Sequence, residues 1–198
     1  MKRIGLFGGS FDPPHIAHVA LAQEALTNLH LDEVRWIPAG QPWQKSRQLA
    51  APTHREAMVR LAIEGEPRFV LDRCELQRRG ASYTLDTVRE LQAQLPDGES
   101  AEWVLLIGQD QYASLHTWRD WKELLSRVTV AVANRPGASV VVHPDVLRTP
   151  HRSVPLPMLN ISSTQVREAV ARGENINHLV PREVASYIAR HGLYKNPM

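Results

Sequence analysis

Two histidines, His15 and His18, lie just after a pair of glycines near the start of the chain, in the segment 8–18 (GGSFDPPHIAH). The apolar run 3–7 before it is typical of a buried strand, and the pattern at 16–29 predicts an amphipathic helix. Glycines let a ligand approach the backbone, and a helix start offers N–H groups to a phosphate. Both histidines project onto or beside the apolar stripe of that helix, toward the crevice above the strand ends. There, imidazoles can donate to phosphate oxygens and stabilise developing negative charge.

A second candidate anion site lies at the start of a helix near the end of the chain. Ser162 and Gln165 have the spacing of a capping box, so a helix begins there with free N–H groups and serine hydroxyls in its first turn. Arg167 lies one turn further, and because helical side chains lean toward the N-terminus, its guanidinium can reach the same anion. The plainer alternatives are a well-capped helix with a surface arginine and, in the first segment, a glycine turn with two ordinary histidines.

Composition limits the class of protein. The 198 residues include 23 basic and 21 acidic side chains, a net charge of +2, which argues against a general nucleic-acid-binding protein. The single cysteine, Cys74, excludes an internal disulfide and suits a reducing cytoplasm. The chain has no pattern of a signal peptide and no apolar stretch long enough to span a membrane. We therefore expect a cytoplasmic α/β protein whose positive field is local.

The elements that must position these residues alternate along the chain. Further strands are expected at 33–38, 67–72, 103–107 and 128–133, and the strand–helix–strand unit at 3–38 predicts parallel pairing. Helices are expected at 53–63, with Thr53 as a cap, from about 82, at 116–125, and at 180–188. Residues 75–80 are expected to form a charged surface connection. Residues 138–153 show no pattern that predicts an element.

Several polar residues follow the expected strands, at the edge where α/β sheets bind ligands. Asp110, after Gly108, can accept hydrogen bonds from ribose hydroxyls or cap the next helix. Lys45 and Arg135 lie in loops where either can meet a phosphate; the alternatives are a solvated loop and a simple turn.

Two aromatic and capping patterns come next. Ser82 or Thr84 can cap a helix, which again offers free N–H groups. Trp118 and Trp121, three residues apart, are expected on one helix face, by default as core aromatics.

The motif pair GGSFDPxHxxH and ISSTxxR resembles the signature of nucleotidyltransferases with the HxGH-type motif. Ala17 stands where that family usually has glycine. The SYT segment at 82–84 and TWxxW at 117–121 are similar to those of bacterial nicotinate-mononucleotide adenylyltransferases. The resemblance implies a Rossmann-like, open, doubly wound parallel sheet of strand order 3-2-1-4-5 in one domain, 1–198. Its core would be 1–137, and a small C-terminal helical portion, 138–198, would carry the second motif.

The resemblance also implies an activity and roles for the residues. The enzyme would transfer the adenylyl group of ATP to nicotinate mononucleotide, with Mg²⁺ carried by ATP because no carboxylate cluster forms a metal cage. His15, His18 and Arg167 would stabilise charge. ATP would be held by Gly8, Gly9, Ser10, Phe11, Gly108, Asp110, Ile161, Ser162 and Ser163. The acceptor would be held by Lys45, Tyr83, Thr84, Trp118 and Arg135.

Two other functions stay open from the sequence. A phosphopantetheine adenylyltransferase would perform the same chemistry on a different acceptor, but that family usually has threonine at the position of His15 and lacks the SYT and TWxxW segments. A catalytically silent nucleotide-binding regulator would be expected to lose His15, His18 or Arg167, and all three are present.

Overall fold

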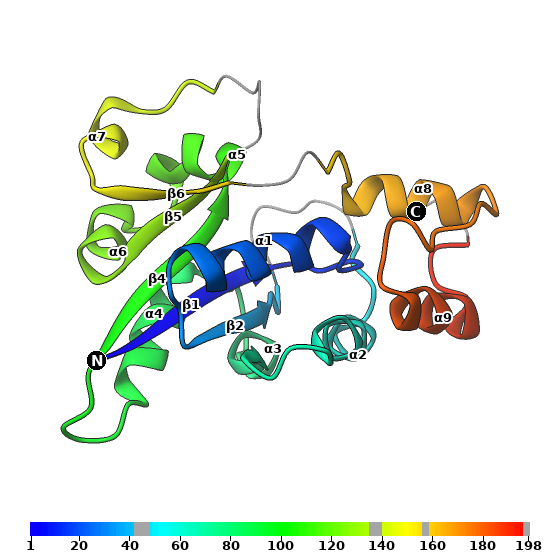
Figure 1. Cartoon of the computed structure of the whole chain (residues 1–198), viewed down its shortest axis with the longest axis horizontal. Coiled ribbons are helices and arrows are strands. Elements are labelled where there is room, and N and C mark those ends of the chain that lie inside the picture. Colours follow the sequence, from blue (N-terminus) through cyan, green and yellow to red (C-terminus); the bar gives the residue numbers. More distant parts are fainter. Residues whose placement is uncertain (42–47, 135–139, 156–158, 196–198) are drawn as a thin grey trace.

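A computed structural model describes residues 1–41, 48–134, 140–155 and 159–195. Within these residues the strands form one six-stranded sheet in the order β3-β2-β1-β4-β5-β6, and all five pairings are parallel (Figure 1). The strands are β1 (Lys2–Gly9), β2 (Glu33–Pro38), β3 (Phe69–Leu71), β4 (Ala101–Gly108), β5 (Thr129–Asn134) and β6 (His151–Pro155).

Helices cover both faces of this sheet. They are α1 (Ile16–Asn28), α2 (Pro52–Ile63), α3 (Cys74–Gln77), α4 (Thr84–Ala93), α5 (Gln109–Ala113), the 3₁₀ turn η1 (Leu115–Thr117), α6 (Trp121–Arg127), α7 (Pro144–Leu147), α8 (Ser163–Ala171) and α9 (Arg182–His191).

Alternation along the strands sends side chains to two separate cores. In β4, Val104 and Leu106 pack with α1 and α2 on one face, whereas Trp103, Leu105 and Ile107 pack with α4 and α6 on the other. A third cluster joins α2 to α8 and α9, which lie together beyond the carboxyl ends of β1 and β2 (Figure 1). The C-terminal helices therefore sit at the edge of the sheet where ligands bind.

The expected doubly wound sheet and its order 3-2-1-4-5 are confirmed, and β6 extends the sheet by one strand beside β5. This strand begins within 138–153, continues to Pro155, and lies beyond the expected core boundary at residue 137. It is an edge strand in which only Val154 is buried, and it ends in proline. Its pairing rests on the backbone, so its side chains carry little periodic signal.

Other boundaries differ from the sequence-based expectations in informative ways. Helix α2 begins at Pro52 after Ala51, and Thr53 is not its cap. The predicted single helix at 116–125 is wrong: Asp120 adopts a left-handed conformation (φ 50°), which separates η1 from α6. Trp118 thus lies in extended backbone and does not share a helix face with Trp121.

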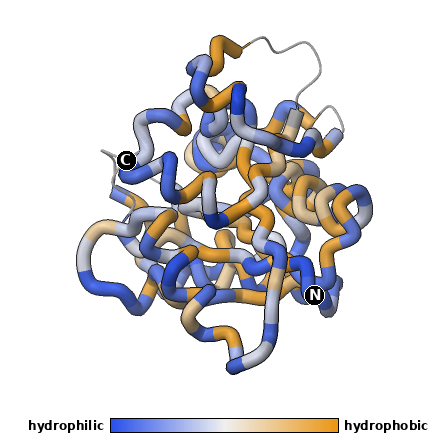
Figure 2. The backbone as a smooth tube through the Cα atoms, turned by 90° about the vertical axis from the view of Figure 1, so that its left-hand side faces the viewer, coloured by the Kyte–Doolittle hydropathy of each residue, from blue (hydrophilic) through white to orange (hydrophobic). Residues whose placement is uncertain are grey.

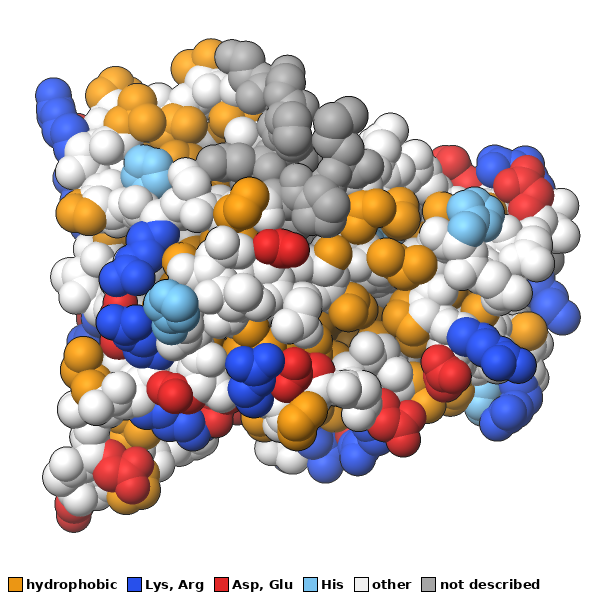
Figure 3. All heavy atoms as spheres, in the orientation of Figure 1, with side chains coloured by type: hydrophobic (Ala, Val, Ile, Leu, Met, Phe, Trp, Pro, Cys, Tyr) orange, Lys and Arg blue, Asp and Glu red, His pale blue; other side chains and the backbone are white. Residues whose placement is uncertain are grey.

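Hydrophobic and charged residues are distributed over the chain as expected for a globular protein. In Figure 2 the hydrophobic stretches alternate with hydrophilic ones along the trace, and the outer loops are mainly hydrophilic. On the face shown in Figure 3, basic and acidic side chains are interspersed, which fits the net charge of +2. In the described part of the chain, no helix combines the length and apolar character needed to traverse a lipid bilayer.

Candidate active site

The glycines of the first motif lie in a strand and not in a turn. Strand β1 continues through Gly8 and Gly9, and the chain reverses at Phe11, which has a positive φ of 46°. A side-chain carbon at Gly9 would lie 3.1 Å from the Phe11 ring, so glycine leaves room for that ring. Among the described residues, a side-chain carbon at Gly8 would meet no atom within 4 Å, so the backbone there is open to a ligand.

The two histidines meet directly after this reversal. Their rings stack with centroids 3.6 Å apart at the start of α1, where His15 is buried and His18 half-buried. The His15 backbone N–H donates to Nδ1 of His18 (3.1 Å), which assigns the His18 proton to Nε2. The Phe11 ring packs edge-on against His18, with centroids 5.1 Å apart. Backbone and aromatic contacts together fix the orientation of the His18 ring.

The late motif contacts the early one directly. The capping box of Ser162 and Gln165 is confirmed: Gln165 N–H donates to Ser162 Oγ (3.2 Å), and Ser162 N–H donates to Gln165 Oε1 (2.8 Å). Ser163 Oγ donates to the carbonyl of Pro13 (2.9 Å). The first turn of α8 is therefore held against the loop that follows β1.

Arg167 completes that contact. Its guanidinium donates to the carbonyl of Asp12 (2.8 Å) and to Thr164 Oγ1 (3.0 Å). Ile161, just before α8, is buried in the third core cluster. The guanidinium of residue 167 therefore lies beside the loop that leads to His15.

A buried arginine that we did not select as a site residue ties the loops together. Arg55 is 1% exposed, and it donates hydrogen bonds to the carbonyls of Ser10 (3.0 Å) and Ala39 (2.6 Å). It also donates to the carbonyls of Ala50 (3.0 Å) and Gly40 (3.3 Å). One cation thus holds the segments that follow β1 and β2.

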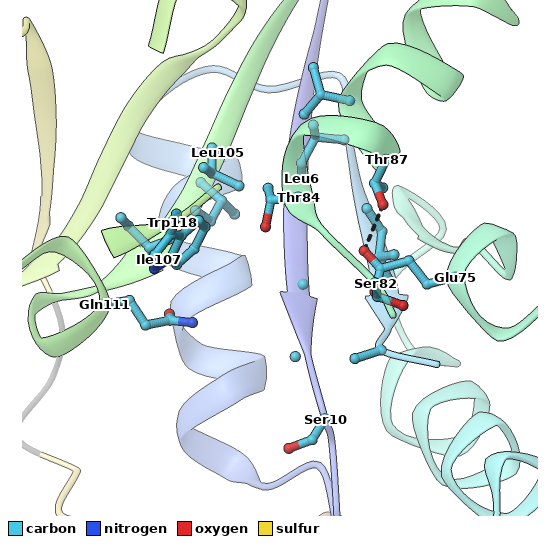
Figure 4. Close-up of a pocket in the computed structure, with 16 residues that line it drawn as sticks. Leu6, Ser10, Glu75, Ser82, Thr84, Thr87, Leu105, Ile107, Gln111 and Trp118 are labelled. Atoms are coloured by element: carbon cyan, nitrogen blue, oxygen red, sulfur yellow. Dashed lines mark hydrogen bonds between the residues drawn. The ribbon is translucent and has the colours of Figure 1, made fainter. Parts of the chain in front are cut away.

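A cavity of about 150 Å³ opens between the end of β1 and helix α4. Figure 4 shows Trp118, Ile107 and Leu105 on one side and Glu75, Ser82 and Thr87 on the other. Gly8, Gly9 and Ser10 form the β1 side, and Gln111 lies near the end of β4. The glycine edge and the residues of the SYT segment therefore line one cavity, whereas His15, His18 and Arg167 lie outside its lining.

The start of α4 faces this cavity with polar groups. The helix begins at Thr84, and Tyr83 occupies the cap position without a capping hydrogen bond from its side chain, so neither Ser82 nor Thr84 caps the helix as expected. Thr84 lines the cavity, and Tyr83 instead packs under the guanidinium of Arg119 (4.8 Å). Among the described residues, Ser82 Oγ and Trp118 Nε1 are buried and make no hydrogen bond of good geometry, although the Ser82 hydroxyl is close enough to Glu75 to lower the pKa of that carboxyl. Both atoms can donate to a ligand in the cavity.

The connection 75–80, expected to be surface, contributes a buried carboxyl. Glu75, in α3, accepts a hydrogen bond from Thr87 Oγ1 (2.7 Å), and Thr87 accepts one from Arg78 (2.9 Å). Arg78 also pairs with Glu90. Burial raises the pKa of Glu75, opposed by the Thr87 hydrogen bond and the charge of Arg78. The sequence carries no local signal for this burial, because its cause is contact with Thr87 of α4, twelve positions further along the chain.

The residues after β4 divide into two environments. Gly108 caps α5, and its N–H donates a hydrogen bond to Gln111 Oε1 (3.2 Å), so the alternative of Asp110 as a cap is wrong. Asp110 lies in the first turn of α5 with its side chain exposed. Trp118 lines the cavity, whereas Trp121 packs against the second core cluster and near His143.

Lys45 and Arg135 lie outside the described residues. Within the described ranges, no group of three or more histidine, cysteine, aspartate or glutamate side chains is arranged to hold a metal ion.

An open glycine edge beside a cavity, with imidazoles and a guanidinium at the starts of two helices, is typical of α/β enzymes that handle nucleoside triphosphates. Nucleotidyltransferases are such a class, and the chain is matched from residue 6 to 169 by the family model described as cytidylyltransferase-like. The chain belongs to this family, among its nicotinate-nucleotide adenylyltransferases.

Two bacterial relatives carry the name probable nicotinate-nucleotide adenylyltransferase. That of Methylibium petroleiphilum is 51% identical, covering 99% of this chain and 94% of the relative. That of Shouchella clausii is 46% identical, covering 98% and 97%. The fold is similar to that of Plasmodium falciparum nicotinic acid mononucleotide adenylyltransferase complexed with NaAD, with a TM-score of 0.78, 19% identity and 98% of each chain covered.

Proposed function

We propose that this enzyme transfers the adenylyl group of ATP to nicotinate mononucleotide, giving deamido-NAD and pyrophosphate. One observation carries the proposal: a single cavity joins the open backbone of Gly8 to Thr84 and Trp118. A nucleotide lying along the end of β1 would there meet an acceptor whose ring rests in the cavity.

The triphosphate end of the site would use the two motifs together. The backbone of 8–11 and the first turn of α8, at Ser162 and Ser163, would hold the phosphates, with Ile161 beside them. His15, His18 and Arg167 would neutralise charge on the transferred and leaving phosphates. Gly108 and Asp110, at the carboxyl edge of β4, would contact the ribose of ATP.

The acceptor end would use the start of α4. Its N–H groups at Thr84, next to Tyr83, favour the carboxylate of a nicotinate ring. The Trp118 face would stack on that ring, and the buried Ser82 hydroxyl would supply a further donor. Lys45 and Arg135 remain proposed contacts of the acceptor phosphate.

The chemistry needs positioning more than a protein nucleophile. A phosphate oxygen of the mononucleotide attacks the α-phosphorus of ATP, the new P–O bond forms, and the bond to the β-phosphate oxygen breaks in line, releasing pyrophosphate. Nucleotidyltransferases generally use Mg²⁺ with ATP; here we propose that the ion is carried on the phosphate oxygens, which are the hard ligands it prefers.

Pyrophosphate release tests the proposal. ATP would be supplied with nicotinate mononucleotide, nicotinamide mononucleotide or phosphopantetheine, and the highest kcat/KM is expected with the first. A preference for phosphopantetheine would assign the site to that acceptor. ATP binding without release for any acceptor would identify a nucleotide-binding regulator and refute the proposal.

A further inference from the structure

A tyrosine from the last described residues contacts Asp12, in the loop between β1 and α1. Tyr194 Oη donates to Asp12 Oδ1 at 2.6 Å, across 182 positions of sequence. Both side chains are buried, at 7% and 0% exposure. The same carboxylate oxygen accepts the backbone N–H of Ala50 (3.3 Å). Hydrogen bonds to a buried carboxylate are among the stronger ones in proteins, so this contact can hold a loop in place.

Asp12 follows the residue at which the loop needs support. Phe11 adopts φ 46°, an unfavourable conformation for a bulky residue that persists only where surrounding contacts enforce it. Its ring supports the edge of His18, with centroids 5.1 Å apart. A contact that fixes Asp12 therefore also fixes the Phe11 backbone and, through it, the His18 ring.

Asp12 is also the contact point of the second motif. The backbone carbonyl of Asp12 accepts a hydrogen bond from the Arg167 guanidinium (2.8 Å), while its carboxylate accepts one from the Tyr194 hydroxyl. Displacement of Asp12 would thus move both the Arg167 guanidinium and the Phe11 ring that packs against His18.

Tyr194 is itself held by the packing of the C-terminal helices. Helix α9 ends at His191 and is capped by Gly192 (φ 61°), and Leu193 N–H donates to the carbonyl of Ile188 (3.1 Å). Ile188 and Tyr194 belong to the cluster that joins α2, α8 and α9. The hydroxyl is therefore presented to Asp12 by a packed element.

We propose that Tyr194 is a positioning residue of the transfer reaction: through Asp12 it holds Phe11, His18 and Arg167 in the arrangement that receives the triphosphate. This inference rests on the proposed function, because it assigns ATP to this loop. It predicts that Tyr194 acts on the ATP side of the site and leaves the acceptor cavity unaffected.

Steady-state kinetics of Tyr194→Phe test this role. We expect kcat to fall by about tenfold and KM for ATP to rise by about threefold, while KM for nicotinate mononucleotide changes by less than about twofold. Tyr187→Phe is the matched control, because that hydroxyl in α9 meets His54 Nδ1 (2.9 Å) and not the loop. Assays run well below the unfolding midpoint of each variant, with the folded fraction measured by circular dichroism. Equal kinetics for both variants, or parallel changes in both KM values, would overturn the inference.

A double-mutant cycle with Asp12→Asn tests whether the two side chains act through one contact. The loss in Tyr194→Phe/Asp12→Asn should be smaller than the product of the single losses; independent losses would overturn the inference.

Binding of a non-hydrolysable ATP analogue, measured by calorimetry, separates failure of this inference from failure of the proposed function. Tyr194→Phe should weaken analogue binding by about threefold even if the acceptor were another compound. Unchanged analogue binding would overturn the positioning role, whereas absence of turnover by the native enzyme would refute the function alone.

Discussion

Replacing Gly8 with alanine should separate folding from ligand binding. Gly8 lies in β1 without a positive φ, and a side-chain carbon there meets no described atom within 4 Å. The new methyl group therefore causes no clash with the residues that the structure describes. Since Gly8 lines the cavity of about 150 Å³, the methyl would instead occupy space next to the path of the nucleotide.

The substitution is expected to increase the stability of the fold and to weaken ATP binding. Exchange of glycine for alanine at a compatible position stabilises a fold by about 0.4–1 kcal/mol, mainly by restricting the unfolded chain, which raises Tm by roughly 1–4 °C at this size. Against the ligand, one extra methyl in a tight contact costs about 1–3 kcal/mol. Converted at about 1.4 kcal/mol per factor of ten, KM for ATP should rise by roughly 5- to 150-fold.

Thermal unfolding and pyrophosphate release give the two readouts. Gly65→Ala is the matched control, because a side-chain carbon there also meets no described atom within 4 Å, and Gly65 lies outside the cavity lining. It should keep wild-type kinetics. A Gly8→Ala enzyme with wild-type KM for ATP would refute the idea that the triphosphate passes along β1. A large fall in its Tm would show that the open side of Gly8 is needed for folding.

Three further substitutions test the roles argued above. His18→Ala should lower kcat by about 10²–10³-fold, the scale of losing a charge-stabilising donor, and near-normal turnover in a pH-matched assay would remove His18 from the mechanism. Trp118→Ala should weaken mononucleotide binding much more than ATP binding in calorimetry; equal losses would contradict stacking. The Tm of Glu75→Gln relative to that of the native protein should increase as the pH rises from about 4 to about 8. Burial raises the native pKa of Glu75, so the native protein loses stability as pH climbs from the ordinary glutamate value toward the raised one. A Tm difference that stays constant over this range would show that Glu75 ionises without penalty.

Strong local patterns predicted the parts of the molecule that depend on neighbouring residues. Strand β2 occupies the expected 33–38, α1 begins directly after His15, and the capping box at Ser162 starts α8. Each has a signal within a few residues: alternation, a helical stripe or a cap. The family resemblance implied that His15, His18 and Arg167 act on one triphosphate, which stays a prediction; the bonds of Ser163 to Pro13 and of Arg167 to Asp12 hold the two motif segments together.

What the sequence did not reveal depends on distant partners. Glu75 reads as surface because its burial comes from Thr87 and from the loop of Gly40, where a side-chain carbon would lie 2.1 Å from the Glu75 carbonyl. Asp120 separates the two tryptophans by adopting a left-handed conformation, and because the residue is not a glycine, the sequence carries no signal of this break. Tyr194 reads as an ordinary residue of a C-terminal tail, because its partner lies near the other end of the sequence.

The four carbonyls gathered by Arg55 bear on how this scaffold can be altered. They come from the segment after β1 and from both ends of the connection between β2 and α2. If either segment were exchanged for one of different length, the buried Arg55 guanidinium would lose carbonyl acceptors. An unpaired buried charge would then lower the stability of the fold by several kcal/mol. Engineering a new acceptor preference by loop grafting would therefore require both segments and Arg55 to be transplanted as one unit.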